Sequence, residues 1–139
     1  MGIPRLSSRA DEESVSVAGH GRRVLVVEDD AAIRRAIAAY LTDAGYVVAE
    51  ADDGHEALAS MREALPNVVV LDLQLRTMSG SDFLNRMRAD LRLAAVPIVI
   101  LSADPGLTGA AATLGARGAL AKPFDLDILL AVVDRVSQT

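Results

Sequence analysis

The chain has 139 residues, 51% of them hydrophobic and 24% charged, and its formal net charge is −5. This length accommodates one domain with a sizeable core, and the composition is that of a soluble globular protein. A negative net charge argues against direct nucleic-acid binding, which requires a basic face. No apolar run approaches the roughly 20 residues that cross a bilayer, and the absence of cysteine excludes a disulfide framework and a thiolate metal site. We therefore expect a cytoplasmic protein without a membrane contact.

Two regions of the chain differ in composition. Residues 1–22 mix serine, glycine and charged residues without a sustained period, which predicts a flexible N-terminal arm. Residues 23–139 alternate between apolar runs and segments of helical periodicity, which predicts one domain. The apolar runs predict strands at 24–27, 46–50, 68–71, 96–101 and 118–121.

The first two helices have clear start and stop signals. Apolar residues at helical spacing predict a helix over 31–44 that ends at Gly45. Asp53 is the expected N-cap of the second helix, which stops at Pro66 and includes Leu65 on its apolar face. Both segments therefore indicate amphipathic helices that pack one face on the strands.

Three further helices are expected in the second half of the chain. Apolar residues from Phe83 to Leu91 line the third helix. A weak helix, rich in alanine and glycine, is expected at about 107–114. Asp125 is the expected cap of the fifth helix, whose inner face extends to Val136. The chain thus contains five repeats of a strand followed by a helix.

This alternation defines the fold class. Strands that are apolar throughout and are joined by helices belong to parallel sheets covered on both faces. Right-handed crossovers then produce a doubly wound α/β sandwich of three layers, with five strands and five helices. In such a sheet, ligands bind beyond the carboxyl ends of the strands, near the point where the strand order reverses. The residues that follow each strand are therefore the candidates for a functional site.

Charged and hydroxyl side chains follow four of the five strands. Glu28 and Asp29 follow the first strand, Asp72 the third, Ser102 the fourth and Lys122 the fifth. Carboxylates gathered in one place repel one another unless a cation lies among them, and a ligand set of oxygen atoms suits Mg²⁺. A hydroxyl and an ammonium are groups that hold a phosphoryl group. This combination predicts that Asp72 is a nucleophile that accepts phosphate.

The same residues lie in motifs that carry a resemblance. The segments "VLVVEDD", "VVVLDL" with "MSG" downstream, "VPIVILSA" and "GARGALAKPF" together resemble the receiver domain of bacterial two-component response regulators. The resemblance runs from about Arg23 to the C-terminus. Each segment is a weak signal alone, whereas an acid pair, an acceptor aspartate, a hydroxyl and a Lys-Pro pair in this order are highly specific. The resemblance implies a flavodoxin-like fold with strand order 2-1-3-4-5.

The resemblance also implies a metal site. Asp29 would hold Mg²⁺ directly, and Glu28 would hold it through a water molecule. Asp72 would be a further ligand, and the backbone carbonyl of Gln74 would complete the protein's part of the metal shell. Asp30, which follows the acid pair, is instead expected to cap the first helix.

Phosphoryl transfer is the chemistry that the resemblance implies for this site. Asp72 would take the group from a phosphohistidine on a sensor histidine kinase or a histidine phosphotransfer protein. Ser102 would hydrogen-bond the transferred group, and Lys122 would form a salt bridge to it. The family pattern includes a cis peptide between Lys122 and Pro123, which helps to aim the ammonium.

Three positions depart from the family pattern. Arg76 stands where a proline is usual, four residues after the acceptor, and Ser79 replaces an aspartate before the downstream glycine. Ala119 occupies the position in the fifth strand that usually carries a tyrosine or phenylalanine switch. Without a ring at Ala119 the usual relay from phosphorylation to output cannot operate, although the phosphorylation residues are present.

Two functions remain open from the sequence. The first is a phosphoryl-accepting receiver that catalyses its own phosphorylation and dephosphorylation and has no multiple-turnover substrate. The alternative is a receiver-like interaction module that signals independently of phosphorylation, which Arg76 and Ala119 favour. An aspartyl-phosphate phosphohydrolase requires a second aspartate where Gln74 stands, and a flavin-binding protein requires a phosphate loop rich in small residues where the acids stand. Both of these are rejected.

The output of such a domain is less constrained by the sequence. Residues 23–139 fill one receiver, so we expect either a single-domain protein or a piece excised from a longer regulator. The expected contact surface for a downstream protein comprises the fourth helix, the fifth strand and the fifth helix, where small residues indicate a pliable switch segment. The same surface is a candidate for homodimerisation.

Overall fold

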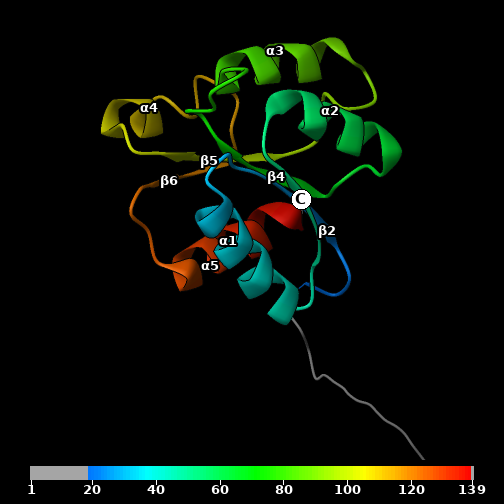
Figure 1. The fold of residues 1–139 in the computed structure, drawn as a ribbon, viewed down its shortest axis with the longest axis vertical. Coiled ribbons are helices and arrows are strands. Elements are labelled where there is room, and N and C mark those ends of the chain that lie inside the picture. The colour runs from blue at the N-terminus through cyan, green and yellow to red at the C-terminus, as the bar shows by residue number, and fades with distance from the viewer. Residues whose placement is uncertain (1–18, 139) are drawn as a thin grey trace, which may run out of the picture.

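The computed structural model describes residues 19–138, in which strands and helices alternate as expected (Figure 1). Five strands are present: β2 (Arg23–Val27), β3 (Val47–Ala51), β4 (Val68–Asp72), β5 (Ile98–Ser102) and β6 (Gly118–Ala121). The helices are α1 (Ala31–Asp43), α2 (Gly54–Glu63), α3 (Gly80–Ala89), α4 (Pro105–Gly109) and α5 (Leu126–Ser137). None of the helices within residues 19–138 has the length and apolar character needed to span a membrane.

The five strands form one parallel sheet in the order β3-β2-β4-β5-β6. In chain order this is second, first, third, fourth and fifth, so the expected flavodoxin-like topology is confirmed. The order reverses between β2 and β4, which pair directly, with Val27 beside Leu71. The crevice in which ligands bind to sheets of this kind therefore lies at the ends of these two strands.

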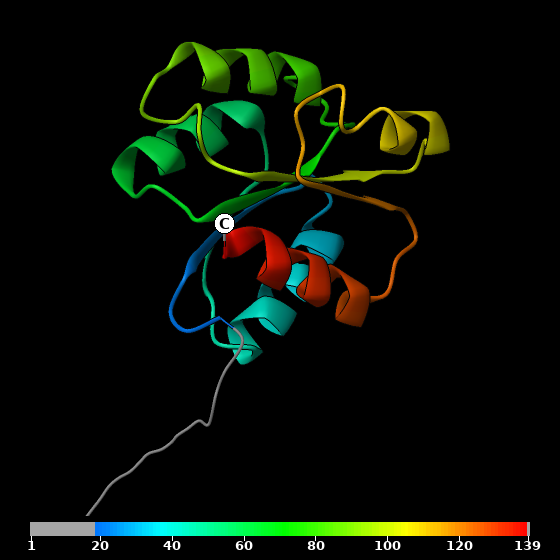
Figure 2. The same ribbon diagram turned by 180° about the vertical axis from the view of Figure 1, so that it is seen from behind.

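Helices cover both faces of the sheet and give it two apolar cores. Helices α1 and α5 lie on one face, and α2, α3 and α4 lie on the other (Figures 1 and 2). Along β2, Val24 and Val26 belong to the core under α1 and α5, whereas Leu25 and Val27 belong to the opposite core. Every residue of β4 and β5 is buried, as expected for central strands of a parallel sheet.

Side-chain N-caps fix the starts of three helices, each in the loop that follows the carboxyl end of a strand. Asp30 Oδ1 accepts a hydrogen bond of 3.1 Å from the Ile33 amide, which confirms its expected role as the N-cap of α1. Asp53 caps α2 in the same way, as expected. Ser79, one of the departures from the family pattern, is the N-cap of α3. Asp125 holds the N-cap position of α5 but makes no side-chain capping bond.

The fourth helix is shorter than expected. It covers only Pro105–Gly109 instead of 107–114, and turns continue to Gly115. Proline suits the first helical position, whereas glycine weakens a helix interior. Gly115 has a φ of 81°, a left-handed conformation that a helix cannot include.

Two leucines that were expected on buried helix faces are exposed. Leu65 is 48% exposed and Leu91 is 92% exposed, so both expectations were wrong. The reason is that α2 ends at Glu63 and α3 ends at Ala89, before either leucine is reached. Helical spacing does not decide burial beyond the end of the helix.

The N-terminal arm was expected over residues 1–22, and residues 1–18 of it lie outside the described part of the chain. Its last four residues are described, and they pack against the turn after α1. The Gly19 amide donates to the Ala44 carbonyl, and the Gly21 amide donates to the Gly45 carbonyl. A Cβ on Gly19 would lie 2.4 Å from the Gly45 backbone, so only glycine fits this close approach.

Candidate functional site

The structure brings three of the predicted carboxylates together at the switch point of the sheet. One oxygen from each of Glu28, Asp29 and Asp72 lies within 4.8 Å of the others. Glu28 is 1% exposed and Asp72 is 2% exposed, whereas Asp29 is largely but not completely buried. Burial of two neighbouring carboxylates is unfavourable unless positive charge lies close to them.

Lys122 supplies that charge. Its Nζ donates a hydrogen bond of 2.7 Å to Glu28 Oε1 and lies 3.4 Å from Asp72 Oδ2. The lysine reaches the acids from the end of β6, where its amide donates to the Ser102 carbonyl at 2.8 Å. The following peptide, to Pro123, is cis, as the resemblance implied. The ammonium is therefore shared by the two buried carboxylates.

Electrostatics in this cluster shift two pKa values. Burial raises the pKa of Glu28; the hydrogen bond from Lys122 opposes this shift, and the neighbouring Asp72 adds to it. For Lys122, burial lowers the pKa, but Glu28 and Asp72 outweigh it, so the net pKa is raised. Lys122 therefore stays charged over the physiological pH range.

Backbone groups orient the carboxylates. Asp72 Oδ1 accepts a hydrogen bond of 3.0 Å from the Gln74 amide, and Glu28 Oε2 accepts one of 3.2 Å from the Asp30 amide. The Gln74 side chain extends to the neighbouring loop, where its Oε1 accepts from the Ala103 amide at 3.2 Å. These bonds link the loops after β4 and β5.

Ser102 ends β5 at the same edge of the sheet. Its neighbour Leu101 pairs with Asp72 across the two strands, so Ser102 lies one residue beyond the level of Asp72 in the sheet. The buried Ser102 hydroxyl accepts from the Asp104 amide at 3.0 Å and lies 3.3 Å from the Asp104 carbonyl. Both of these contacts are with Asp104, within the loop that follows β5.

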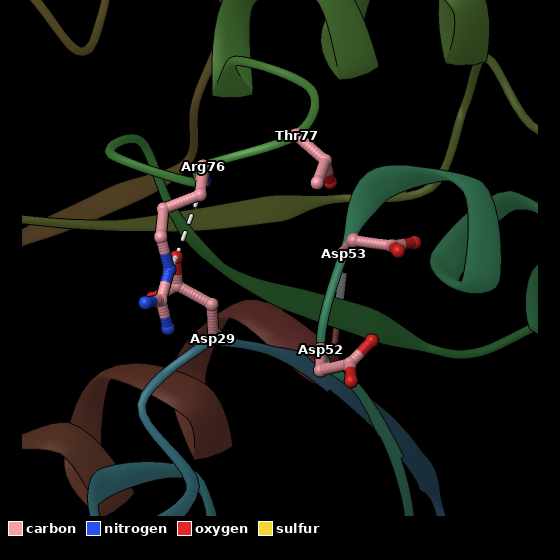
Figure 3. A pocket seen from close by; sticks show the side chains of 5 residues that line it. All are labelled: Asp29, Asp52, Asp53, Arg76 and Thr77. Carbon is pink, nitrogen blue, oxygen red and sulfur yellow. Dashed lines mark hydrogen bonds and ion pairs between the residues drawn. The ribbon is translucent and has the colours of Figure 1, made fainter.

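The sequence did not predict the partner of Asp29. Arg76, which follows β4 by four residues, donates to Asp29 Oδ2 from its backbone amide at 3.2 Å and from its Nε at 3.1 Å (Figure 3). The two residues border a cavity of about 180 Å³, and Asp52 and Asp53 lie on its opposite side. Arg76 was recognisable in the sequence as a departure from the family, but its partner was not.

A second hollow, of about 480 Å³, lies beside Lys122 and is mainly apolar. Helix α1 contributes Ile33, Ala36 and Ile37 to it, and the segment after β6 contributes Phe124 and Leu126. Apolar hollows of this kind often mark contact sites.

The donor set at the carboxylates fits a hard divalent cation. It consists of carboxylate oxygens, which Mg²⁺ prefers over the nitrogen or sulfur ligands of softer metals. The three oxygens are close enough to share one ion, and two of the carboxylates come from adjacent residues at the end of β2.

A doubly wound parallel sheet with buried acids and a lysine at its switch point is typical of α/β proteins that bind ligands at the carboxyl ends of their strands. The family model of the response regulator receiver domain matches residues 24–134, and the chain belongs to this family. It is 38% identical over 114 residues to the DNA-binding response regulator MtrA of Mycolicibacterium paratuberculosis. That match covers 81% of this chain, which spans only about half (49%) of MtrA.

Solved structures agree with this assignment. The chemotaxis response regulator CheY4 of Vibrio cholerae is similar with a TM-score of 0.77 and 35% identity, over 84% of this chain and 98% of CheY4. The receiver domain of a sensor histidine kinase from Pseudomonas aeruginosa PAO1 is similar with a TM-score of 0.76 and 29% identity, over 86% of this chain and 99% of that domain. The latter structure contains a magnesium ion coordinated in the active site cleft.

Proposed function

We propose that this receiver domain accepts a phosphoryl group on Asp72 from a phosphohistidine and signals through contacts that depend on that phosphorylation. The observation that carries the proposal is the setting of Asp72. It is a buried carboxylate at the switch point of the sheet, oriented by the Gln74 amide and 3.4 Å from the Lys122 ammonium. A carboxylate held in this way is suited to nucleophilic attack.

In the transfer, a carboxylate oxygen of Asp72 forms a bond to phosphorus while the bond between phosphorus and the donor's imidazole nitrogen breaks. The electron pair of the broken bond stays on the imidazole. The Gln74 amide keeps the carboxylate oriented, and Lys122 stabilises the negative charge of the incoming group. Ser102 would give up its bonds within the loop and donate to a phosphoryl oxygen, next to the salt bridge from Lys122.

Asp29, Asp72 and the backbone carbonyl of Gln74 would hold Mg²⁺, which neutralises charge on the phosphoryl oxygens when it is bound. Both oxygens of Glu28 already accept hydrogen bonds, from Lys122 and from Asp30. This supports a contact between Glu28 and the ion through water. The magnesium ion in the similar receiver domain from Pseudomonas aeruginosa supports the choice of metal.

The proposed donor is a protein, either a sensor histidine kinase or a histidine phosphotransfer protein, in the cytoplasm. The apolar hollow beside Lys122 supports a protein donor, because its side chains offer contact surface next to the acceptor. The proposed output surface consists of α4, β6 and α5, and homodimerisation would use the same surface. No direct contact of this domain with nucleic acid is proposed. Hydrolysis of the aspartyl phosphate by the domain itself would end the signal.

One observation favours the alternative of a module that signals independently of phosphorylation. Ala119 pairs with Ile100 across β5 and β6 and packs against the core, at the position where the family usually has an aromatic switch. A methyl group there cannot make the large rotation of a ring. The alternative predicts the same partner binding with and without phosphate.

The proposal is tested by intact mass measurement after incubation with a small acyl phosphate, with and without Mg²⁺. We expect one phosphoryl group to be gained only in the presence of Mg²⁺. A folded protein that gains none under either condition would contradict the proposal and favour the phosphorylation-independent module.

A further inference from the structure

Arg76 places a fixed positive charge at the mouth of the carboxylate cluster. Its Nε and its backbone amide both donate to the same oxygen of Asp29. The arginine side chain is 78% exposed, whereas the Asp29 side chain is 18% exposed. The carboxylate has therefore lost much of its hydration, and the guanidinium replaces part of it.

The loop that carries Arg76 is anchored on both sides of this residue. Leu75 and Met78 are buried in the core, and Met78 packs against Gly54 at the start of α2. The Gly80 amide donates to the Leu73 carbonyl at 3.1 Å, which closes the loop. These contacts hold the loop backbone in the position from which Arg76 contacts Asp29.

Cations already accompany all three carboxylates of the cluster. Lys122 contacts Glu28 and Asp72, and Arg76 contacts Asp29. A divalent cation that uses Asp29 as a ligand must therefore share that carboxylate with a guanidinium, and two positive groups that close together repel.

We propose that Arg76 is a built-in counter-ion of Asp29 that competes with the divalent cation and lowers the affinity of the site for it. The inference rests on the proposed function, since it requires that Asp29 binds the cation. It adds that the residue at this loop position sets the cation concentration at which the domain becomes ready for phosphorylation.

The expected effect is modest because the arginine is exposed. An exposed ion pair changes an equilibrium constant by roughly two- to fivefold. Asp29 is largely buried and the cation carries two charges, so we expect the affinity for Mg²⁺ to tighten about two- to tenfold when the guanidinium is removed.

The test is a titration of the full chain with MgCl₂, followed through the backbone amide NMR signals of residues 28–30 and 72–74. The proteins are the wild type, Arg76→Gln, Arg76→Lys and Arg135→Gln. The last variant removes the same charge from an exposed position in the last turn of α5, at the end of the domain away from the carboxylates. Arg76→Gln keeps the backbone hydrogen bond to Asp29 and changes an exposed side chain only.

We expect at least twofold tighter binding for Arg76→Gln, and affinity close to the wild type for Arg76→Lys and Arg135→Gln. The difference between Arg76→Gln and the wild type should shrink as KCl is raised, because salt screens exposed charges. Equal or weaker binding by Arg76→Gln would overturn the inference and leave the proposed function standing. Absence of saturable binding in both the wild type and Arg76→Gln would overturn the inference together with the proposed metal site.

Discussion

Lys122 Nζ lies 2.7 Å from Glu28 Oε1, although the two residues are 94 positions apart in the sequence. Glu28 is almost completely buried. A buried ion pair of this kind depends on both partners, because loss of one leaves the other charged and without compensation. We therefore expect the pair to stabilise the fold as well as to form part of the site.

We expect Lys122→Met to lower the free energy of unfolding by about 2–3 kcal/mol at pH 7, since it leaves Glu28 unpaired in the interior. Urea denaturation measures this change. Burial already raises the pKa of Glu28, and loss of the lysine raises it further. The variant can then neutralise Glu28 by taking up a proton, so its deficit relative to the wild type should shrink as the pH falls towards 5.

The control for this prediction is the double variant Glu28→Gln with Lys122→Met. Removal of the buried charge should recover a large part of the lost stability. A double variant that is as unstable as the sum of the two single variants would show that the pair is not coupled in the way the geometry indicates.

Tyr46 predicts a second pH dependence, far from the site. Its hydroxyl donates to Asp134 Oδ1 at 3.1 Å and lies 3.4 Å from Ser137 Oγ, and burial, with a contribution from Asp134, raises its pKa. Above about pH 10, the unfolded chain loses this proton while the folded chain retains it, so stability falls as the pH rises.

Thermal unfolding at a series of alkaline pH values should show a steeper loss for the wild type than for Tyr46→Phe. Lys122, whose raised pKa acts in the same alkaline range, is present in both proteins, so its contribution cancels in the difference. At neutral pH the variant should be less stable by about 1 kcal/mol because it loses the hydroxyl's hydrogen bonds. Parallel pH profiles would contradict the assignment.

The apolar hollow beside Lys122 predicts a difference between phosphoryl donors. Ala36 and Ala39 are both exposed on α1, but only Ala36 lines the hollow. We expect Ala36→Asp to slow phosphoryl transfer from a protein donor at least about tenfold. The substitution places a charge in an apolar contact, and the loss of binding free energy is comparable to that of removing a weak interface hot spot.

Transfer from a small acyl phosphate should be unchanged in Ala36→Asp, since that donor needs no protein contact. Ala39→Asp serves as the matched control and should behave as the wild type with both donors. Initial rates of phosphorylation measured by intact mass give the comparison. Equal slowing by the two substitutions would locate the donor contact elsewhere.

The region around α4 is predicted to respond to phosphorylation. Helix α4 has only five residues, turns follow it, and β6 is only partly buried. Segments with few buried contacts open at low free-energy cost. Hydrogen exchange of residues 105–121 should therefore change when the domain is phosphorylated, and unchanged exchange there would remove the proposed switch segment.

Particular residues show how much of the molecule could be predicted from the sequence. The strands and the polar residues that end them are local signals, so the fold and the convergence of Glu28, Asp29 and Asp72 were predicted correctly. The N-caps Asp30 and Asp53 are local signals too, and both are confirmed.

The features that the sequence did not predict depend on tertiary structure or on weak local preferences. Arg76 and Asp29 are 47 positions apart, and their ion pair depends on the tertiary position of the loop, in which Leu75 and Met78 are buried. Leu91 lies at a helical spacing from Phe83, but the spacing does not reveal that α3 has already ended. The extent of α4 was misjudged because glycine weakens its helical signal.

The most direct test of the central claim is to locate the phosphoryl group. The wild type, Asp72→Asn and Asp52→Asn are incubated with a small acyl phosphate and Mg²⁺, reduced with borohydride to mark the acyl phosphate, and digested for peptide mass analysis. Asp52 is an exposed acid on the far side of the neighbouring cavity. We predict modification of Asp72 in the wild type and in Asp52→Asn, and none in Asp72→Asn. Modification at another residue, or equal modification of Asp72→Asn, would contradict the assignment of Asp72 as the phosphoryl acceptor.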